Sequence, residues 1–196
     1  MKKILIGIVI IGLLTLIGFK LIGSKKNQEV TAIAKFSDLF PEKEGTYNYK
    51  VDGKSKKVQV KVNQKEDKTT ITMVYDTEEK TSVNRIYEVN HDKILEFSKS
   101  YQGDKVVSEE TATEILNSFP YVGLTYKSVD RLITYEITEM KNNKVTIVST
   151  QKLVDYEKNK TVEKEYKVKR VFEKGKGLVL YQTDYNGSKS TVLKMK

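Results

Sequence analysis

Few residues in this chain have types and spacings that suit an active site. The chain has no cysteine and a single histidine, His91, which excludes thiolate catalysis and cysteine-ligated metals and leaves a zinc site without partners. A serine triad would have to use His91, yet no G-x-S-x-G segment accompanies it. Because Asn90 and Asp92 flank His91 between two predicted strands, we expect a turn residue. We predict no catalytic residue, no metal site and no cofactor.

Two acidic pairs are the remaining candidates for acid–base chemistry. Glu78-Glu79 falls in a charged loop, and Glu109-Glu110 suits the first turn of a helix, where carboxylates interact favourably with the helix dipole. Adjacent carboxylates point apart, so solvated surface is a simpler interpretation than a glycosidase pair. The segment Lys174-Gly175-Lys176-Gly177 lacks the spacing of a phosphate-binding loop, and we expect a hairpin bend or β-bulge there.

The 12 tyrosines, in a chain without tryptophan, are the most suggestive feature for binding. Most of them share predicted strand faces with aliphatic residues, which favours a tyrosine-rich core whose hydroxyl groups reach the rim. The functional alternative is a concave face that binds an apolar or glycan ligand. Under that alternative, the candidate ligand-binding residues are Tyr47, Tyr49, Tyr75, Tyr135 and Tyr166.

Alternating apolar and polar residues predict that β-strands position these side chains. A period of two is typical of a strand with one solvated face, as in antiparallel sheets. Asp52-Gly53 and Asn186-Gly187 predict two-residue hairpin turns. We therefore predict an all-β fold with minor α content, a curved antiparallel sheet or sheets of about ten strands in two meander-like halves. The expected strands are 47–51, 58–62, 71–75, 83–89, 93–99, 133–137, 145–147, 161–172, 178–185 and 188–195.

One helix is predicted to interrupt the strands. Ser108 or Thr111 can cap it, Thr111 has capping-box spacing to Glu114, and Pro120 ends it. A shorter helical turn is expected over 33–40. The apolar stripe of the predicted helix, at i, i+3, i+4 and i+7, consists of Ala112, Ile115, Leu116 and Phe119.

A weak internal repeat divides the domain. Phe40-Pro41 precedes Thr46-Tyr47, and Phe119-Pro120 precedes Thr125-Tyr126 at the same spacing, 79 residues later. A duplication would give halves at 36–107 and 108–196, with Phe40 and Phe119 buried at matching positions. The alternative is a coincidence of residues that commonly end helices and open strands.

The first residues of the chain predict its location. Lys2-Lys3 precede an apolar segment at 4–23, which Lys20 alone interrupts. Its 20 residues suit an uncleaved membrane helix, whereas a cleaved signal peptide and a buried soluble helix are the alternatives. The basic residues flanking the segment are nearly balanced, and the short leading tail favours a cytoplasmic N-terminus. The predicted plan is a cytoplasmic tail at 1–3, an anchor or signal at 4–23, a linker at 24–35 and an extracellular domain at 36–196.

Charge and composition narrow the partners. The chain has a net charge of +9, but residues 36–196 carry 29 basic and 25 acidic side chains, a net charge of +4. Interspersed charges of both signs argue against nucleic acid and leave attraction to anionic wall polymers or lipid headgroups open. The Lys-, Ile-, Asn- and Tyr-rich composition is typical of low-GC Gram-positive bacteria. The absence of cysteine excludes disulfides.

Two segments carry a family resemblance. The opening Phe40-Pro41-x3-Gly45-x-Tyr47-x-Tyr49 resembles the F-P-x3-G-x-[WY] start of a broad group of uncharacterised bacterial exported lipoproteins, and 172–179 resembles the K-G-x-G-L-V segment near their C-termini. Tyrosine replaces the common tryptophan, and Ser24 stands where a lipobox cysteine would accept lipid. The resemblance implies a curved antiparallel sheet outside the membrane and carries no agreed activity.

Two functional classes are consistent with these patterns. The favoured one is a non-enzymatic protein of the bacterial cell envelope, attached to the membrane by its N-terminal helix, that binds an envelope protein, lipid or glycan on a tyrosine-rich sheet. The alternative is a cell-wall hydrolase that uses unidentified Glu or Asp residues. A deep pocket with converging carboxylates would favour the hydrolase, and a shallow apolar groove would favour binding.

Overall fold

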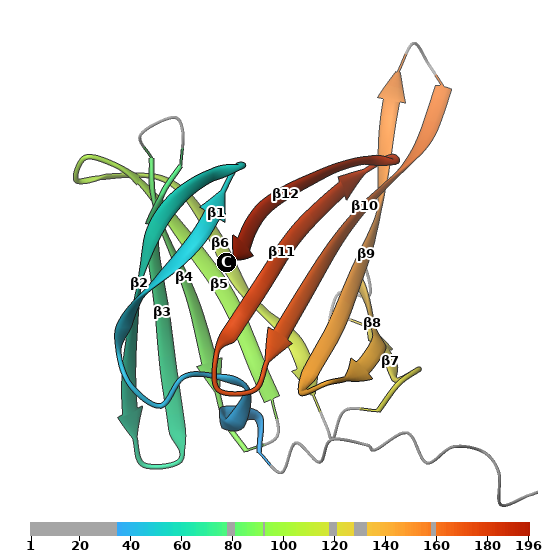
Figure 1. Cartoon of the computed structure of the whole chain (residues 1–196). Helices are drawn as coiled ribbons and strands as arrows, with labels where there is room; N and C mark the ends of the chain where they lie inside the picture. The colour runs from blue at the N-terminus through green and yellow to red at the C-terminus, as the bar shows by residue number, and fades with distance from the viewer. Residues whose placement is uncertain (1–34, 78–80, 92, 118–120, 128–132, 158–159) are drawn as a thin grey trace, which may run out of the picture. The chain divides into compact units, whose positions relative to one another are not determined.

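The computed structural model describes residues 35–196 apart from 78–80, 92, 118–120, 128–132 and 158–159. These residues form a short 3-10 helix, η1 (Phe36–Leu39), and one antiparallel sheet of 12 strands (Figure 1). The all-β antiparallel prediction is therefore confirmed. The strands are β1 (Gly45–Val51), β2 (Lys54–Lys65), β3 (Lys68–Asp76), β4 (Ser82–Val89), β5 (Lys93–Gln102), β6 (Lys105–Asn117), β7 (Thr125–Lys127), β8 (Ile133–Lys141), β9 (Lys144–Glu157), β10 (Lys160–Glu173), β11 (Gly177–Tyr185) and β12 (Ser188–Met195).

Hairpins connect most neighbouring strands, as the turn residues predict. Asn186 and Gly187 have φ angles of 51° and 91°, the left-handed backbone that a two-residue turn between antiparallel strands requires. Asp52-Gly53 forms a turn of the same kind between β1 and β2. Along β4, half-buried and buried residues alternate without exception, because successive side chains point to opposite faces.

The order of the strands joins the two ends of the domain. The sheet runs β6-β5-β4-β3-β2-β1-β12-β11-β10-β9-β8-β7, so each half is a meander and the halves meet where β1 pairs with β12. In that pairing, Tyr49 lies opposite Met195 and Val51 lies opposite Leu193. The duplication stays a hypothesis, since Phe119-Pro120 lies outside the described residues.

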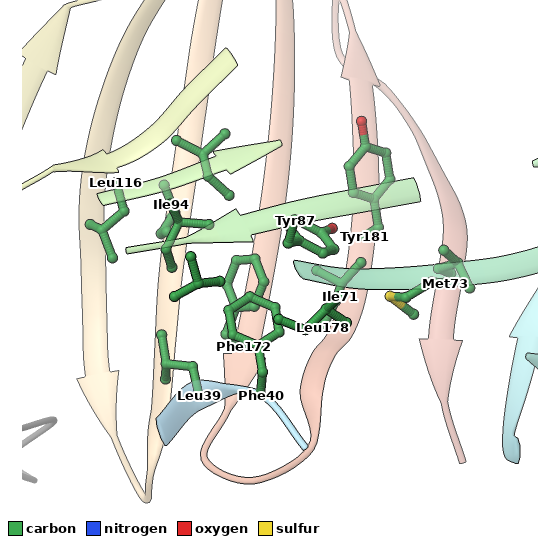
Figure 2. Packing of buried hydrophobic residues seen from close by; sticks show 14 of the residues in the cluster. Leu39, Phe40, Ile71, Met73, Tyr87, Ile94, Leu116, Phe172, Leu178 and Tyr181 are labelled. Atoms are coloured by element: carbon green, nitrogen blue, oxygen red, sulfur yellow. The ribbon is translucent and has the colours of Figure 1, made fainter. Parts of the chain in front are cut away.

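The core lies between the two halves, because the sheet curves until β4 and β5 face β10. Three aromatic rings from distant segments meet there: Phe40 lies 5.4 Å from Tyr87 and 5.5 Å from Phe172, centroid to centroid. Leu39 and Phe40 are both buried, and Figure 2 shows Phe40 beside Phe172. The expected helical turn over 33–40 is thus present as η1, and the predicted burial of Phe40 is confirmed. Phe119, its predicted counterpart, is not among the described residues.

The predicted helix over 111–119 is wrong, because β6 extends to Asn117. The register explains the error: Ile94 pairs with Leu116 but Leu95 pairs with Glu114, so the ladder shifts and Ile115 is an extra residue. An extra residue in one strand lets two successive side chains turn to the same face. Ile115 and Leu116 are both fully buried as a result, and this local break in alternation imitates the spacing of a helix.

Among the described residues, no helix has the length and apolar character needed to cross a membrane. The predicted anchor at 4–23 lies outside those residues.

Candidate functional site

A cleft of about 850 Å³ opens between η1 and the first three strands. We call it the η1 cleft. Its volume is in the range of small-molecule sites. The lining residues are Ser37, Asp38, Phe40, Pro41, Glu42, Lys43, Glu44, Tyr47, Val62, Gln64, Thr69, Lys174 and Gly175.

One wall of the η1 cleft is the core face of the sheet where it becomes accessible to solvent. Gln64 pairs with Thr69 in the β2–β3 ladder, one step beyond the Val62–Ile71 pair. Alternation places these side chains on the face that buries Ile71. Thr69 is half-buried and Gln64 is exposed. The side chains that line this wall therefore occupy core-facing positions that the described residues leave at least partly accessible.

The opposite wall is built from two segments that lie far apart in the sequence. The backbone N–H of Gly175 donates to the carbonyl oxygen of Asp38 at 2.8 Å. Gly177 lies so close to the η1 segment that an added Cβ would meet Pro41 Cδ at 3.4 Å. Tyr49 Oη donates to the carbonyl oxygen of Leu178 at 2.6 Å. The segments 40–49 and 172–179, which carry the sequence resemblance, thus pack together around the η1 cleft.

Tyr47 is the aromatic side chain of the cleft with partial exposure. Its ring lies along the backbone of β1, where a Cβ added to Gly45 would approach ring atom Cε2 to 3.3 Å. Glycine at position 45 therefore leaves room for the ring to lie on the strand. Tyr47 is half-buried and lines the cleft, whereas Phe40 and Pro41 are buried beneath it. The arrangement offers a flat aromatic surface beside polar groups.

The lining of the η1 cleft contains more acidic than basic side chains. Asp38, Glu42 and Glu44 supply three carboxylates, and Lys43 and Lys174 supply two ammonium groups. Asp38 is half-buried and the other four side chains are exposed. The lining therefore carries a net charge of −1 on a domain whose net charge is positive.

A second polar assembly, which we call the arginine cluster, lies inside the core. Its members are Arg85 on β4, Glu96 on β5 and Arg170 on β10, with Tyr87, Ser149 and Tyr181 around them. Arg85 Nη1 donates to Glu96 Oε1 at 3.0 Å, and Arg170 Nε and Nη2 donate to Glu96 Oε2 at 2.7 and 2.6 Å. The Glu96 carboxylate thus joins β5 to both β4 and β10.

The partners of the arginine cluster satisfy most of its remaining polar groups. Tyr87 Oη donates to Glu96 Oε1 at 2.8 Å, and Arg170 Nη1 donates to Ser149 Oγ at 2.9 Å. The Arg85 guanidinium lies over the Tyr181 ring, with its carbon 3.9 Å from the ring centroid. Stacking on an aromatic face suits a guanidinium that has lost water. Arg85 Nε, by contrast, has no hydrogen-bond partner.

Burial and charge compete in setting the protonation of the arginine cluster. Burial alone would raise the pKa of Glu96, but the charges of Arg170 and Arg85, with the hydrogen bonds from Arg170 and Tyr87, lower that pKa to about 2. Burial raises the pKa of Tyr87 well above its ordinary value, and the Glu96 charge adds to the rise. The cluster consequently holds one carboxylate between two guanidinium groups at neutral pH. Removing one member of such a buried ion cluster would leave a charge without its partner, which is strongly destabilising.

The five tyrosines predicted to bind ligand are distributed over several environments. Tyr47 lines the η1 cleft, whereas Tyr49, Tyr75 and Tyr135 are buried in the core. Tyr166 is half-buried. Burial raises the pKa of Tyr75 and of Tyr166, and the charge of the nearby Arg85 opposes the rise in both, which places them beside the arginine cluster.

Tyr135 lies elsewhere in the core. It stacks on Tyr126 with ring centroids 5.0 Å apart and an interplanar angle of 9°. Tyr49 points inward two residues after Tyr47 on β1, and burial raises its pKa. The structure therefore brings Tyr75 and Tyr166 towards one cluster, and it leaves Tyr47 as the predicted tyrosine that lines the η1 cleft.

The other candidate residues lie at surface positions. His91 is exposed in the connection between β4 and β5, as expected for a turn residue. Glu109 and Glu110 are exposed on β6 rather than on a helix; Glu109 pairs with Lys99 at 2.8 Å and Glu110 accepts a hydrogen bond from Ser98. Glu78-Glu79 lies outside the described residues. The segment 174–177 forms the predicted bend, between β10 and β11.

Sequence reasoning did not find the arginine cluster, although a signal was present. The signal is a charged residue at an inward-facing position of an alternating strand. Arg85 is one example, since it lies between the inward-facing Val83 and Tyr87, and Glu96 and Arg170 occupy equivalent positions on their strands. A charged residue at such a position must find a partner inside the protein. Asp38, Gln64 and Thr69 gave no comparable signal, because polar residues beside turns are ordinary surface residues.

Comparisons with known proteins do not identify the chain. No family model matches it, and neither the curated proteins nor the solved structures include a match. Within the part of the chain that the structure describes, no three His, Asp or Glu side chains converge as metal ligands would.

Proposed function

We propose that this protein is a non-enzymatic binding protein of the bacterial cell envelope, and that the η1 cleft is its binding site. The observation that carries the proposal is a cleft of ligand size, about 850 Å³, at which an aromatic side chain adjoins carboxylate, amide and hydroxyl groups. Small-molecule sites combine an apolar surface with a few polar groups that fix orientation. Tyr47 supplies the first, and Asp38, Gln64 and Thr69 supply the second.

The rigidity of the surrounding walls supports this choice of site. Both walls belong to hydrogen-bonded strands or are tied to them, since Gly175 donates to Asp38 and Gln64 pairs with Thr69 within the β2–β3 ladder. A site held on rigid elements loses little conformational entropy when it binds. Of the tyrosine-rich sheet face predicted to bind ligand, this proposal therefore retains only the end where Tyr47 lines the η1 cleft.

The proposed location rests on the sequence. Residues 4–23 have the length and composition of a membrane anchor, and the short basic tail before them favours a cytoplasmic start. The protein would then be a single-pass membrane protein with its β domain outside. Carbonate extraction and protease treatment of intact cells test this. Extraction as a soluble protein, or protection of the domain from added protease, would contradict it.

The binding function is tested with the full-length protein in lipid nanodiscs. Thermal unfolding is followed in the presence of neutral glycans, anionic wall polymers, short-chain lipids and wall peptides. At least one class is expected to raise Tm in the wild type and to lose that effect in Tyr47→Ala, because ligands that bind the native state stabilise it. Tyr185→Ala, which removes an exposed tyrosine at the end of β11, is the matched control. Equal shifts in both variants would contradict the proposal.

Hydrolysis of wall glycan remains the alternative, and the carboxylates of the η1 cleft decide it. General acid catalysis needs a carboxyl group whose surroundings raise its pKa, usually by excluding water. Glu42 and Glu44 are exposed to solvent, which favours binding over hydrolysis. Release of reducing ends from purified wall by the wild type, abolished in Asp38→Asn with the fold intact, would instead establish the hydrolase.

A further inference from the structure

We propose that the ligand of the η1 cleft is a neutral saccharide of a few sugar units. This inference rests on the proposed function and adds the chemical class of the ligand. Three properties of the lining point to it: its net charge, its mixture of donors and acceptors, and the position of its aromatic ring.

The charge of the lining disfavours anionic ligands. Three carboxylates oppose two ammonium groups across the cleft, so a phosphate, a fatty-acid carboxylate or a polyanionic wall polymer meets a net negative site. The domain around the cleft is positively charged, with 29 basic and 25 acidic side chains in 36–196. Its general field attracts anionic polymers to the surface, while the lining itself favours a neutral molecule.

The polar groups match the hydroxyl groups of a sugar. A sugar hydroxyl both donates and accepts, and so it pairs best where both functions are present. The Gln64 amide and the Thr69 hydroxyl each donate and accept, and the Asp38 carboxylate accepts. An acyl chain would leave these groups without partners and lose the hydrogen bonds they make to water.

The apolar part of the η1 cleft includes one aromatic and one aliphatic side chain with partial exposure. The Tyr47 ring lies along β1 over Gly45, and Val62 lines the same cleft. One flat aromatic ring with one aliphatic neighbour provides a platform for the C–H face of a pyranose, with the polar groups at its edge. A lipid tail would require a continuous apolar channel, whereas the apolar Phe40 and Pro41 of this cleft are already buried against the core.

Isothermal titration calorimetry on the full-length protein in nanodiscs tests the ligand class. Maltoside detergents are avoided because they carry a sugar. The probes are the tetramer of N-acetylglucosamine, cellotetraose, a glycerol-phosphate oligomer and decanoate. We expect one of the two neutral saccharides to bind and both anionic probes to bind at least tenfold more weakly.

Matched variants place the binding in the η1 cleft. Tyr47→Ala and Gln64→Ala are expected to weaken saccharide binding at least tenfold. Tyr185→Ala and Gln59→Ala are expected to leave it unchanged, because Gln59 lies on the opposite, exposed face of the same strand as Gln64. Gln64 is itself exposed, so its variant tests the site even where Tyr47→Ala unfolds. A further variant, Glu42→Lys with Glu44→Lys, reverses the sign of the lining charge and is expected to admit the glycerol-phosphate oligomer.

The outcomes separate the two proposals. Saccharide binding that depends on Tyr47 and Gln64 supports both. Preferential binding of decanoate or the glycerol-phosphate oligomer to the wild type, with the same dependence, overturns the saccharide and leaves the binding function in place. Absence of any probe binding that depends on the η1 cleft overturns both.

Discussion

The η1 cleft and the arginine cluster are built from the same alternating strands, yet they hold polar side chains in opposite circumstances. Arg85, Glu96 and Arg170 lie where the two halves of the sheet face each other, and every one of them is at least nine-tenths buried. Gln64 and Thr69 occupy core-facing positions that the described residues leave at least partly accessible at the η1 cleft. The difference teaches that coverage by the opposite half decides whether an inward polar residue stabilises the fold or is available to a ligand.

The largest expected effect comes from removing the shared carboxylate of the arginine cluster. Glu96→Gln would leave two buried guanidinium groups without a counter-charge, which costs ~3–5 kcal/mol of unfolding free energy. Urea denaturation of the variant and the wild type measures it. Glu109→Gln, which removes the exposed partner of Lys99, is the matched control and should change stability little. If the two variants behave alike, the cluster does not hold the sheet halves together.

Acid should remove the stability that the Glu96 carboxylate contributes to the arginine cluster. The folded pKa of Glu96, about 2, lies below its ordinary value of 4.5. Its contribution is therefore complete above pH 4.5 and is lost as the pH falls towards 2, a loss of about 3 kcal/mol. Urea midpoints measured from pH 6 to pH 2.5 in the wild type and Glu96→Gln test this. A smaller slope should persist in both, because Lys176 and Lys144 lower the pKa of Glu173. Equal slopes would refute the assignment.

Tyr49 and Tyr47, both on β1, allow the core and the η1 cleft to be compared through single substitutions. Tyr49→Phe removes the hydrogen bond to the Leu178 carbonyl group and leaves a buried acceptor unpaired, which should cost ~1–3 kcal/mol. Tyr47→Phe, at the half-buried position of the η1 cleft, should have little effect on stability. Guanidinium denaturation of both variants provides the measurement. A larger loss from Tyr47→Phe would show that Tyr47 belongs to the core.

The smallest expected effect on stability is at the polar rim of the η1 cleft. Gln64→Ala removes an exposed side chain, and surface substitutions of this kind usually change the unfolding free energy by less than ~0.5 kcal/mol. Thermal unfolding of Gln64→Ala beside Gln59→Ala checks this expectation. A clear loss in Gln64→Ala alone would mean that the residue stabilises the β2–β3 hairpin rather than serving a ligand.

The elements of the fold were predictable wherever local patterns determine them. Alternation located most of the strands, and the Asn186-Gly187 pair located its turn, because each depends on neighbouring residues alone. The pattern failed at β6, where the extra residue Ile115 places two successive apolar side chains on one face. A bulge depends on the register against a neighbouring strand, which a local reading of the sequence does not contain.

The candidate sites were harder to predict because contacts between distant residues create them. The packing of Gly177 against Pro41 and the bond between Gly175 and Asp38 close the η1 cleft, and each joins segments more than 130 residues apart. Arg170 meets Glu96 across 74 residues. Composition suggested binding through tyrosine, and of the five named tyrosines Tyr47 alone lines the cleft. The remaining lining residues acquire their role from the curvature of the sheet.

The pairing of β1 with β12 has a consequence for how the domain is made. Tyr49 finds its partner, Met195, only when the last strand has been synthesised, so the two meanders cannot join while the chain is still emerging. Every other pairing in the described sheet joins strands that follow one another in the sequence, so the β1–β12 pairing closes the longest loop and has the largest cost in loop entropy. Each meander can therefore form from pairings between consecutive strands, and the pairing of β12 with β1 then joins the two meanders into one sheet.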